Sequence, residues 1–170
     1  YIDEYNYIHW FSPQKRMVLK PEEMKVSKSL KKSILNKGFV IKSNENFEAV
    51  MRNCSNIKRK HEDSTWISEE FIQAYTDLHH LDIAFSIECY LDEELVGGLY
   101  GLLIGDVFCG ESMFAKVTDA SKVAFYHLCQ QAEKNGIKLI DCQVYNDHLA
   151  SLGAHEITRE DYFKILKESF

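Results

Sequence analysis

The stretch IAFSIECYLDEELVGGLYGLLIGDVFCGESMFA, residues 83–115, decides the fold, because it contains three apolar runs separated by turn residues. The runs occupy residues 83–91, 95–105 and 106–115, and DEE joins the first to the second. This pattern predicts three successive strands that pair as an antiparallel meander. The glycines of LVGGLYG lack the G-x-G-x-x-G order and no helix follows them, so they predict a bulged or closely approached strand rather than a phosphate loop.

Helical patterns precede this meander. Residues 21–37 open with Pro21 and two acids and stop before Gly38, which predicts one amphipathic helix. Further helices are predicted at residues 46–57 and 68–81, with Ser68 as an N-cap of the second. FVIKS (39–43) predicts a short strand, and KRKHEDST (58–65) predicts a polar loop.

After the meander the pattern returns to helix. A long helix is predicted from Asp119 or Ser121 to Asn135–Gly136, followed by a strand, IKLIDCQVY (137–145), and then a turn, a possible short strand and a final helix. This order predicts an α+β fold, with a mixed, mostly antiparallel sheet flanked by helices. A length of 170 residues predicts one domain, spanning residues 1–170.

Charge is distributed unevenly along a chain whose net charge is −6. Residues 1–63 carry 13 Lys/Arg against 8 Asp/Glu, whereas residues 64–170 carry 7 against 18. A basic half joined to an acidic half can contact a polyanion on one face and a cation on another, although segregated solvated surface explains the counts equally well. The longest uncharged apolar run, residues 95–105, is too short for a membrane span of about 20 residues.

The five cysteines are an odd number and form no C-x-x-C pair. This usage argues against a disulfide framework or a zinc site, and it favours buried thiols in a reducing compartment. The opening YIDEYNYIHW has no basic head followed by an apolar block, so no secretory signal is predicted there. We therefore expect a cytoplasmic location and no membrane association.

The segment DCQ, residues 141–143, ends an apolar strand pattern and contains the first candidate site. Strand alternation predicts that Asp141 and Gln143 share one face, while Cys142 joins Ile140 and Val144 on the other. Cys142 is therefore expected to be a structural thiol rather than a nucleophile. Asp141 and Gln143 form a polar pair that needs partners, either as a structural hydrogen-bond pair or as a functional one.

A second candidate is Glu111, which lies within the aromatic and sulfur-rich run FCGESMF (108–114). A carboxylate in such surroundings needs a partner or a ligand, unless it is simply a solvated hairpin acid. Aromatic residues near predicted loops, in WFSP (10–13) and TWI (65–67), could stack on nucleobases or pack in the core.

Taken together and in order, the motifs are more specific than any one of them. They are WFSP with Arg16 after it, VSKSLKK, TWI followed by AY and LH, SIE, ELVGGLYG, GESMF, DASK, LIDCQ and SLGA. This series resembles the leucyl/phenylalanyl-tRNA–protein transferases of bacteria, from about Trp10 to about Leu166. The resemblance implies a GNAT-like acyltransferase fold, no metal or organic cofactor, and a monomer.

The resemblance also implies an activity. Members of the family move Leu, Phe or Met from aminoacyl-tRNA to the N-terminus of proteins that begin with Arg or Lys, which marks them for degradation by the N-degron route. Its partners would thus be aminoacyl-tRNA and such acceptor proteins.

The resemblance also implies roles for the residues of this sequence that match the family's motifs. The resemblance assigns a catalytic role to Asp141, Gln143 and Glu111. It assigns the pocket for the transferred side chain to Leu99, Phe108, Phe125, Leu128 and Ile140. It assigns the tRNA 3′ end to Phe11, Trp66 and Ser112, the acceptor peptide to Asn146, and tRNA phosphates to Arg16, Lys28, Lys31 and Lys32. In this scheme the Gln143 carbonyl oxygen accepts a hydrogen bond from the attacking amine and Asp141 orients Gln143, by proton transfer or by positioning alone.

Three departures from the family pattern stand out, and one of them is that the sequence ends soon after the SLGA segment, without the usual longer tail. About nine residues precede Trp10, where the family usually has an N-terminal domain, so we expect a short form with residues 1–9 as a remnant of that region. Phe85 replaces the His of the family's AHSIE segment. The alternatives are a non-catalytic binder of aminoacyl-tRNA or N-degron peptides, and an acetyl-CoA-dependent acyltransferase. GESMFAKVTDASK, which stands where the pyrophosphate loop of the latter should be, disfavours it.

Overall fold

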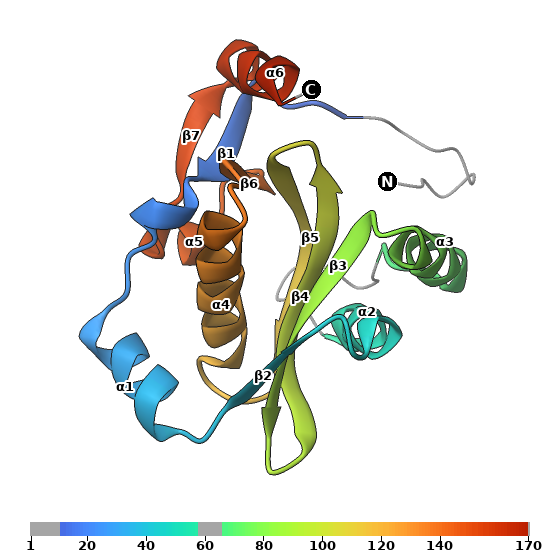
Figure 1. The fold of residues 1–170 in the computed structure, drawn as a ribbon, viewed down its shortest axis with the longest axis vertical. Helices are drawn as coiled ribbons and strands as arrows, with labels where there is room; N and C mark the ends of the chain where they lie inside the picture. The colour runs from blue at the N-terminus through green and yellow to red at the C-terminus, as the bar shows by residue number, and fades with distance from the viewer. Residues whose placement is uncertain (1–10, 58–65, 170) are drawn as a thin grey trace.

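The computed structural model describes residues 11–57 and 66–169, and within them the strands form one seven-stranded sheet in the order β2-β3-β4-β5-β6-β1-β7 (Figure 1). The strands are β1 (Lys15–Leu19), β2 (Val40–Ser43), β3 (Ala84–Leu91), β4 (Glu94–Ile104), β5 (Val107–Ala115), β6 (Leu139–Gln143) and β7 (His155–Thr158). In this sheet β5 and β6 run parallel, and the other neighbouring strands run antiparallel. The predicted mixed, mostly antiparallel sheet is confirmed.

Helices cover both faces of the sheet (Figure 1). They are the 3₁₀ turn η1 (Pro21–Glu23), α1 (Lys28–Asn36), α2 (Phe47–Asn56), α3 (Glu69–His80), α4 (Ala120–Lys134), α5 (Asp147–Ser151) and α6 (Arg159–Glu168). The largest core cluster joins α4 to one face of the central strands. On the opposite face, α2 and α3 pack over β4, while α6 packs through Tyr162 on β1, β5 and β6.

The meander that decides the fold is confirmed. Strands β3 and β4 pair with Glu88 opposite Gly98, and β4 and β5 pair with Leu99 opposite Met113. The glycines of β4 permit the predicted close approach, because a Cβ on Gly97 would lie 2.5 Å from the Cβ of Ala120 at the start of α4. The predicted helices at residues 46–57, 68–81 and 119–135 are also confirmed, with Ser68 as the N-cap of α3.

The single helix predicted over residues 21–37 is wrong. The chain forms η1, continues without helix, and begins α1 only at Lys28, where the Ser27 Oγ accepts the Leu30 N–H at 3.1 Å. The break has a tertiary cause, because the Lys25 N–H donates to the Leu152 carbonyl at 2.8 Å. Val26, four residues before the buried Leu30, lies ahead of the helix and is exposed.

The sequence pattern did not predict β1 or α5. Strand β1 lies between β6 and β7, far from either in sequence, with Val18 opposite Asp141 and also opposite His155. The predicted polar loop at residues 58–65, the remnant at residues 1–9 and Trp10 lie outside the described residues. No helix in the described part of the chain has the length and hydropathy of a membrane span.

Candidate active site

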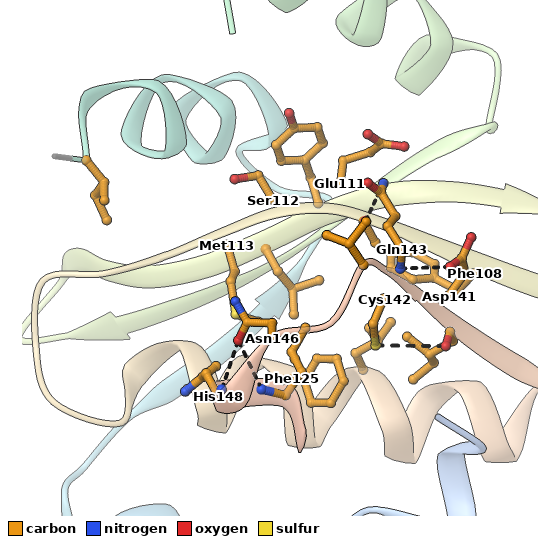
Figure 2. A pocket seen from close by; sticks show the side chains of 18 of the residues that line it. Phe108, Glu111, Ser112, Met113, Phe125, Asp141, Cys142, Gln143, Asn146 and His148 are labelled. Carbon is orange, nitrogen blue, oxygen red and sulfur yellow. Dashed lines mark hydrogen bonds between the residues drawn. The ribbon is translucent and has the colours of Figure 1, made fainter. Parts of the chain in front are cut away.

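A cavity of about 660 Å³ lies where the two parallel strands separate (Figure 2). Strand β5 pairs with β6 only from Val107 to Cys109, and the residues that follow in each strand flank the opening. The five residues predicted to hold the transferred side chain all line this cavity and are buried: Leu99, Phe108, Phe125, Leu128 and Ile140. Volumes of this size are typical of sites for small organic groups.

Two β-bulges shape the polar rim of the cavity. In the β4–β5 ladder Tyr100 pairs with Ser112 and Gly101 pairs with Gly110, so Glu111 is the extra residue. A bulge inserts one residue without a partner, which bends the strand and redirects the side chains beside it.

The second bulge lies in β6, the neighbouring strand. Here Met17 pairs with Gln143 and Val18 pairs with Asp141, so Cys142 is the extra residue. Gln143 then adopts a left-handed backbone with φ of 67°, which ends the strand. Strict alternation therefore does not extend to Val144, which is exposed rather than packed beside Ile140 as predicted.

The Gln143 side chain reaches back across the gap between the strands toward Glu111 (Figure 2). Its amide Nε2 donates to the Gly110 carbonyl at 2.9 Å, and the same side chain is close enough to Glu111 to lower the pKa of that carboxyl group. The amide nitrogen is therefore held by the backbone of β5. Oε1 is therefore the acceptor that Gln143 can offer to a substrate.

Asp141 lies in a different environment from Gln143, although the two were expected to pair on one face. The Asp141 side chain is 0% exposed and forms a two-pronged ion pair with Arg16, with Nε 2.9 Å from Oδ1 and Nη2 2.7 Å from Oδ2. The Tyr162 hydroxyl donates to Oδ2 at 2.8 Å. Gln143 contacts this carboxylate through its backbone N–H, at 2.8 Å from Oδ1, and not through its amide.

This geometry also corrects the expectation for Arg16. The guanidinium expected to bind tRNA phosphates is directed inward at Asp141, and the Arg16 side chain is only 19% exposed. Its Nε and Nη2 are both engaged by Asp141, so the guanidinium serves as the counter-ion of a buried carboxylate. Lys28, Lys31 and Lys32, by contrast, are exposed on α1.

Glu111 is a perturbed acid. Burial raises the pKa of its carboxyl group, and although hydrogen bonds with Gln143 and Tyr75 favour the ionised form, the net shift is upward. The charge of Asp141 raises this pKa further and that of Arg16 lowers it. The pKa of the Tyr75 hydroxyl is also raised, first by burial and then by the charge of Glu111. A raised pKa in a cleft is typical of functional sites.

The pKa of Glu111 predicts how the stability of the protein depends on pH. A carboxyl group whose pKa is higher in the folded than in the unfolded state binds more protons when folded, so stability falls as the pH rises from the ordinary range of a glutamate through the folded value. Glu111→Gln removes this dependence. We expect wild type to lose stability relative to this variant as the pH rises from about 4 to 7, measured by urea unfolding at each pH.

A matched control is Glu94→Gln, which changes an exposed acid at the start of β4. The difference in stability between wild type and Glu94→Gln should stay constant over the same pH range. If wild type instead gains stability over Glu111→Gln as the pH rises, the carboxylate of Glu111 is better stabilised in the folded protein than its burial indicates.

Cys142 is a structural thiol, as its sequence position predicted. It lines the cavity and packs against the core cluster, and its thiol donates to the Ile140 carbonyl at 3.9 Å. Burial, and then the charge of Asp141, raise the pKa of the thiol to about 12, so it is protonated at neutral pH. The cysteines are all free, and the other four are buried.

The structure separates the remaining candidate residues into two groups. Trp66, Ser112 and Asn146 line the cavity, and the Asn146 Oδ1 also caps α5 by accepting the His148 N–H at 2.9 Å. Phe11 is 75% exposed and does not line the cavity. In the described residues no group of three His, Cys, Asp or Glu side chains is placed to hold a metal ion.

Sequence reasoning missed several residues of the site. Met113 and His148 line the cavity, Tyr75 contacts Glu111, and Tyr162 contacts Asp141. Tyr75 stands in the AY motif already quoted, but no role was assigned to it, and no local pattern singles out Tyr162, which reaches the site from α6. Met113 was adjacent to candidates already named in GESMF.

The arrangement of strands and helices defines the class of the fold. The solved structure of FemX matches with a TM-score of 0.66 at 11% identity, covering 88% of this chain and 60% of that one. A GCN5-related N-acetyltransferase from Kribbella flavida matches with a TM-score of 0.51 at 12% identity, covering 84% and 53%. The protein therefore has a GNAT-like acyltransferase fold, with its cavity between the two separating strands.

Sequence comparison narrows this class to a family. The model of the leucyl/phenylalanyl-tRNA protein transferase family matches residues 18–167. A transferase of that name from Flavobacterium johnsoniae is 52% identical over 94% of this chain and 76% of its own length. One from Nitrosospira multiformis is 51% identical over 95% and 69%. The chain belongs to the leucyl/phenylalanyl-tRNA protein transferase family.

Proposed function

We propose that the protein transfers Leu, Phe or Met from aminoacyl-tRNA to the N-terminal Arg or Lys of acceptor proteins, as a step of the N-degron route. The observation that supports this best is the composition of the cavity. Its apolar wall, made by residues such as Phe108, Phe125 and Ile140, meets a polar rim that carries Gln143 and Glu111. An aminoacyl ester with an apolar side chain needs an apolar wall to hold that side chain, and polar groups to align its ester with the attacking amine.

The apolar wall would select the amino acid. Phe125 and Leu128 stand three positions apart on α4, and with Leu99 from β4 they contribute to one surface for the transferred side chain. Discrimination by such a wall amounts to about 1–3 kcal/mol per methylene, so a range of apolar residues is accepted and charged ones are excluded.

The polar rim would align the two substrates. The N-terminal amine attacks the ester carbonyl, an amide bond forms, the bond to the ribose oxygen breaks, and the proton lost by the amine balances the one gained by the ribose hydroxyl. Gln143 Oε1 accepts a hydrogen bond from the amine and so directs its lone pair at the carbonyl. Burial keeps the Cys142 thiol protonated and so removes it as a nucleophile, which supports direct transfer from the tRNA ester to the amine.

Exposed groups around the cavity would hold the larger substrates. Lys28, Lys31 and Lys32 on α1 would contact tRNA phosphates, which adds affinity without sequence selectivity. Trp66 at the cavity and the exposed Phe11 would stack on the terminal adenosine, near Ser112. The acceptor peptide would lie near Asn146, with Glu111 contacting its ammonium or a ribose hydroxyl.

Transfer of radiolabelled Leu from Leu-tRNA to a synthetic peptide tests this proposal. We expect incorporation into peptides that begin with Arg or Lys, and only background incorporation into an otherwise identical peptide that begins with Ala. Because the acceptor carries a cation, the difference should be at least about tenfold. Tight tRNA binding without transfer, even at saturating peptide, would show a non-catalytic binder instead.

The start of α4 argues against acetyl-CoA as the acyl donor. A helix N-terminus binds the pyrophosphate of a nucleotide through free N–H groups and positive potential. Here Asp119 stands at that end of α4, and its carboxylate accepts the Ser33 hydroxyl at 2.7 Å and lies 3.8 Å from the Lys37 ammonium. A carboxylate at this position repels a phosphate group.

The proposed protein is cytoplasmic and acts as a monomer. The aminoacyl-tRNA substrate and the five free thiols support a cytoplasmic location. A single chain supplies both walls of the cavity, from α4 and from strands β4, β5 and β6, which supports a monomer as the active form. Sedimentation at the concentrations used in the transfer assay measures the oligomeric state directly.

A further inference from the structure

A buried ion pair connects the last helix to the strand that carries Gln143. Asp141 in β6 is held by Arg16 from β1 and by Tyr162 from α6. The Arg16 guanidinium also lies over the Tyr162 ring, with Cζ 5.1 Å from its centroid. Three elements that are far apart in sequence thus meet at one carboxylate.

The two oxygens of this carboxylate are already used. Oδ1 accepts the Arg16 Nε–H at 2.9 Å and the Gln143 N–H at 2.8 Å, and Oδ2 accepts the Arg16 Nη2–H at 2.7 Å and the Tyr162 hydroxyl at 2.8 Å. A carboxylate offers about four acceptor positions. None remains for a proton from a substrate. Asp141 borders the cavity, but its side chain is fully buried, and the bond that its carboxylate makes to Gln143 is to the backbone N–H.

That N–H belongs to a residue in an uncommon conformation. Gln143 has a φ of 67°, which non-glycine residues adopt rarely and keep only where surrounding contacts hold them. Its backbone is fixed by Asp141 and its amide by the Gly110 carbonyl, 2.9 Å from Nε2. The two hydrogen bonds together set the direction of Oε1.

We infer that Arg16 and Tyr162 are positioning residues for aminoacyl transfer, because they fix Asp141, which in turn holds the backbone of Gln143 and so directs its amide at the attacking amine. This inference rests on the proposed function. It makes Asp141 a fixed acceptor rather than a proton relay, and it makes α6 part of the catalytic apparatus although α6 does not line the cavity.

Tyr162→Phe and Arg16→Lys test the inference in the full chain. Each keeps most of the packing and removes one or more hydrogen bonds to Asp141. We expect kcat to fall by about 10- to 100-fold, since displacements near 1 Å cost this much, while KM for Leu-tRNA changes less than about threefold. Matched controls are Tyr90→Phe and Lys15→Met, which alter a hydroxyl in β3 and an exposed cation beside Arg16; both should retain wild-type kcat.

A rescue experiment separates positioning from proton relay. Arg16→Met alone leaves a buried carboxylate without its cation, and kcat should fall further than in Arg16→Lys. Adding Asp141→Asn removes the buried charge while its Oδ1 still accepts the Gln143 N–H. We expect this double variant to recover at least about tenfold in kcat over Arg16→Met. A relay requires an ionisable group, so a double variant no better than Arg16→Met overturns the inference.

Hydrogen exchange at the Gln143 backbone amide gives a readout that does not depend on activity. In Tyr162→Phe and Arg16→Lys this amide should exchange at least about tenfold faster than in the two controls, with other amides of β6 unchanged. Unchanged exchange at Gln143 overturns the inference, even if kcat falls. If wild type transfers no amino acid while exchange responds as expected, the proposed function fails and the positioning network stands.

Discussion

Replacing Gln143 with Asn is expected to lower kcat for transfer by about 100-fold or more, with little change in stability. Asn tolerates the left-handed backbone of this position better than most residues, so the turn at the end of β6 is kept. The shorter side chain, however, cannot span from β6 to the Gly110 carbonyl, now 2.9 Å from Nε2. The acceptor for the amine is therefore withdrawn from the cavity.

The measurement is single-turnover transfer of Leu from saturating Leu-tRNA to an Arg-starting peptide, beside thermal unfolding. Gln131→Asn is the matched control, because it shortens a glutamine of α4 that donates to Ser43 in β2, away from Glu111. Its kcat should equal that of wild type. A Gln143→Asn protein that transfers within about threefold of wild type would remove Gln143 from the mechanism.

Gly101→Ala is expected to cause the largest loss of stability, about 3 kcal/mol or more. A Cβ at this position would lie 2.3 Å from the Cys109 carbonyl oxygen and 2.7 Å from the Phe108 ring. The first contact is with backbone, which cannot move without breaking the ladder beside the Glu111 bulge. The second would push Phe108 into the cavity. For a protein of this size the loss corresponds to a fall in Tm of about 6 to 12 °C.

Gly110, directly opposite Gly101 in the ladder, provides the control. The nearest atom to a Cβ there is the Asp141 carbonyl oxygen at 3.4 Å, an ordinary contact. Gly110→Ala should therefore change the free energy of unfolding by less than about 1 kcal/mol. Equal losses in the two variants, measured by urea unfolding, would show that strand glycines as such, rather than the close approach at Gly101, determine the effect.

Local patterns predicted most of the elements, and tertiary contacts explain where they failed. The meander and the helices α2, α3 and α4 carry their own turn and capping signals, so their positions could be predicted. The break before α1 could not, because it depends on the Lys25 hydrogen bond to Leu152, a residue distant in sequence. Strand β1 was missed because its partners lie more than a hundred positions away.

The site was predicted as a set of residues but not as a geometry. Motif order pointed to Glu111, Gln143 and the apolar wall, which do line one cavity. Alternation failed at Gln143 because a bulge at Cys142 precedes it, and no composition signal marks a bulge. Arg16 was assigned to phosphates by its charge, and only the fold shows that Asp141 lies opposite it.

The position of β1 in the sheet has a consequence for synthesis of the protein. Residues 15–19 leave the ribosome early, yet their partner strand begins at Leu139, and translation at about 5–20 residues per second separates the two by roughly 6 to 24 s. During that interval both edges of β1 lack their hydrogen-bond partners. Asp141 is synthesised after its counter-ion Arg16, and Tyr162, which donates to the same carboxylate, is synthesised later still. The network that holds Gln143 can therefore form only after β1, β6 and α6 have all been synthesised.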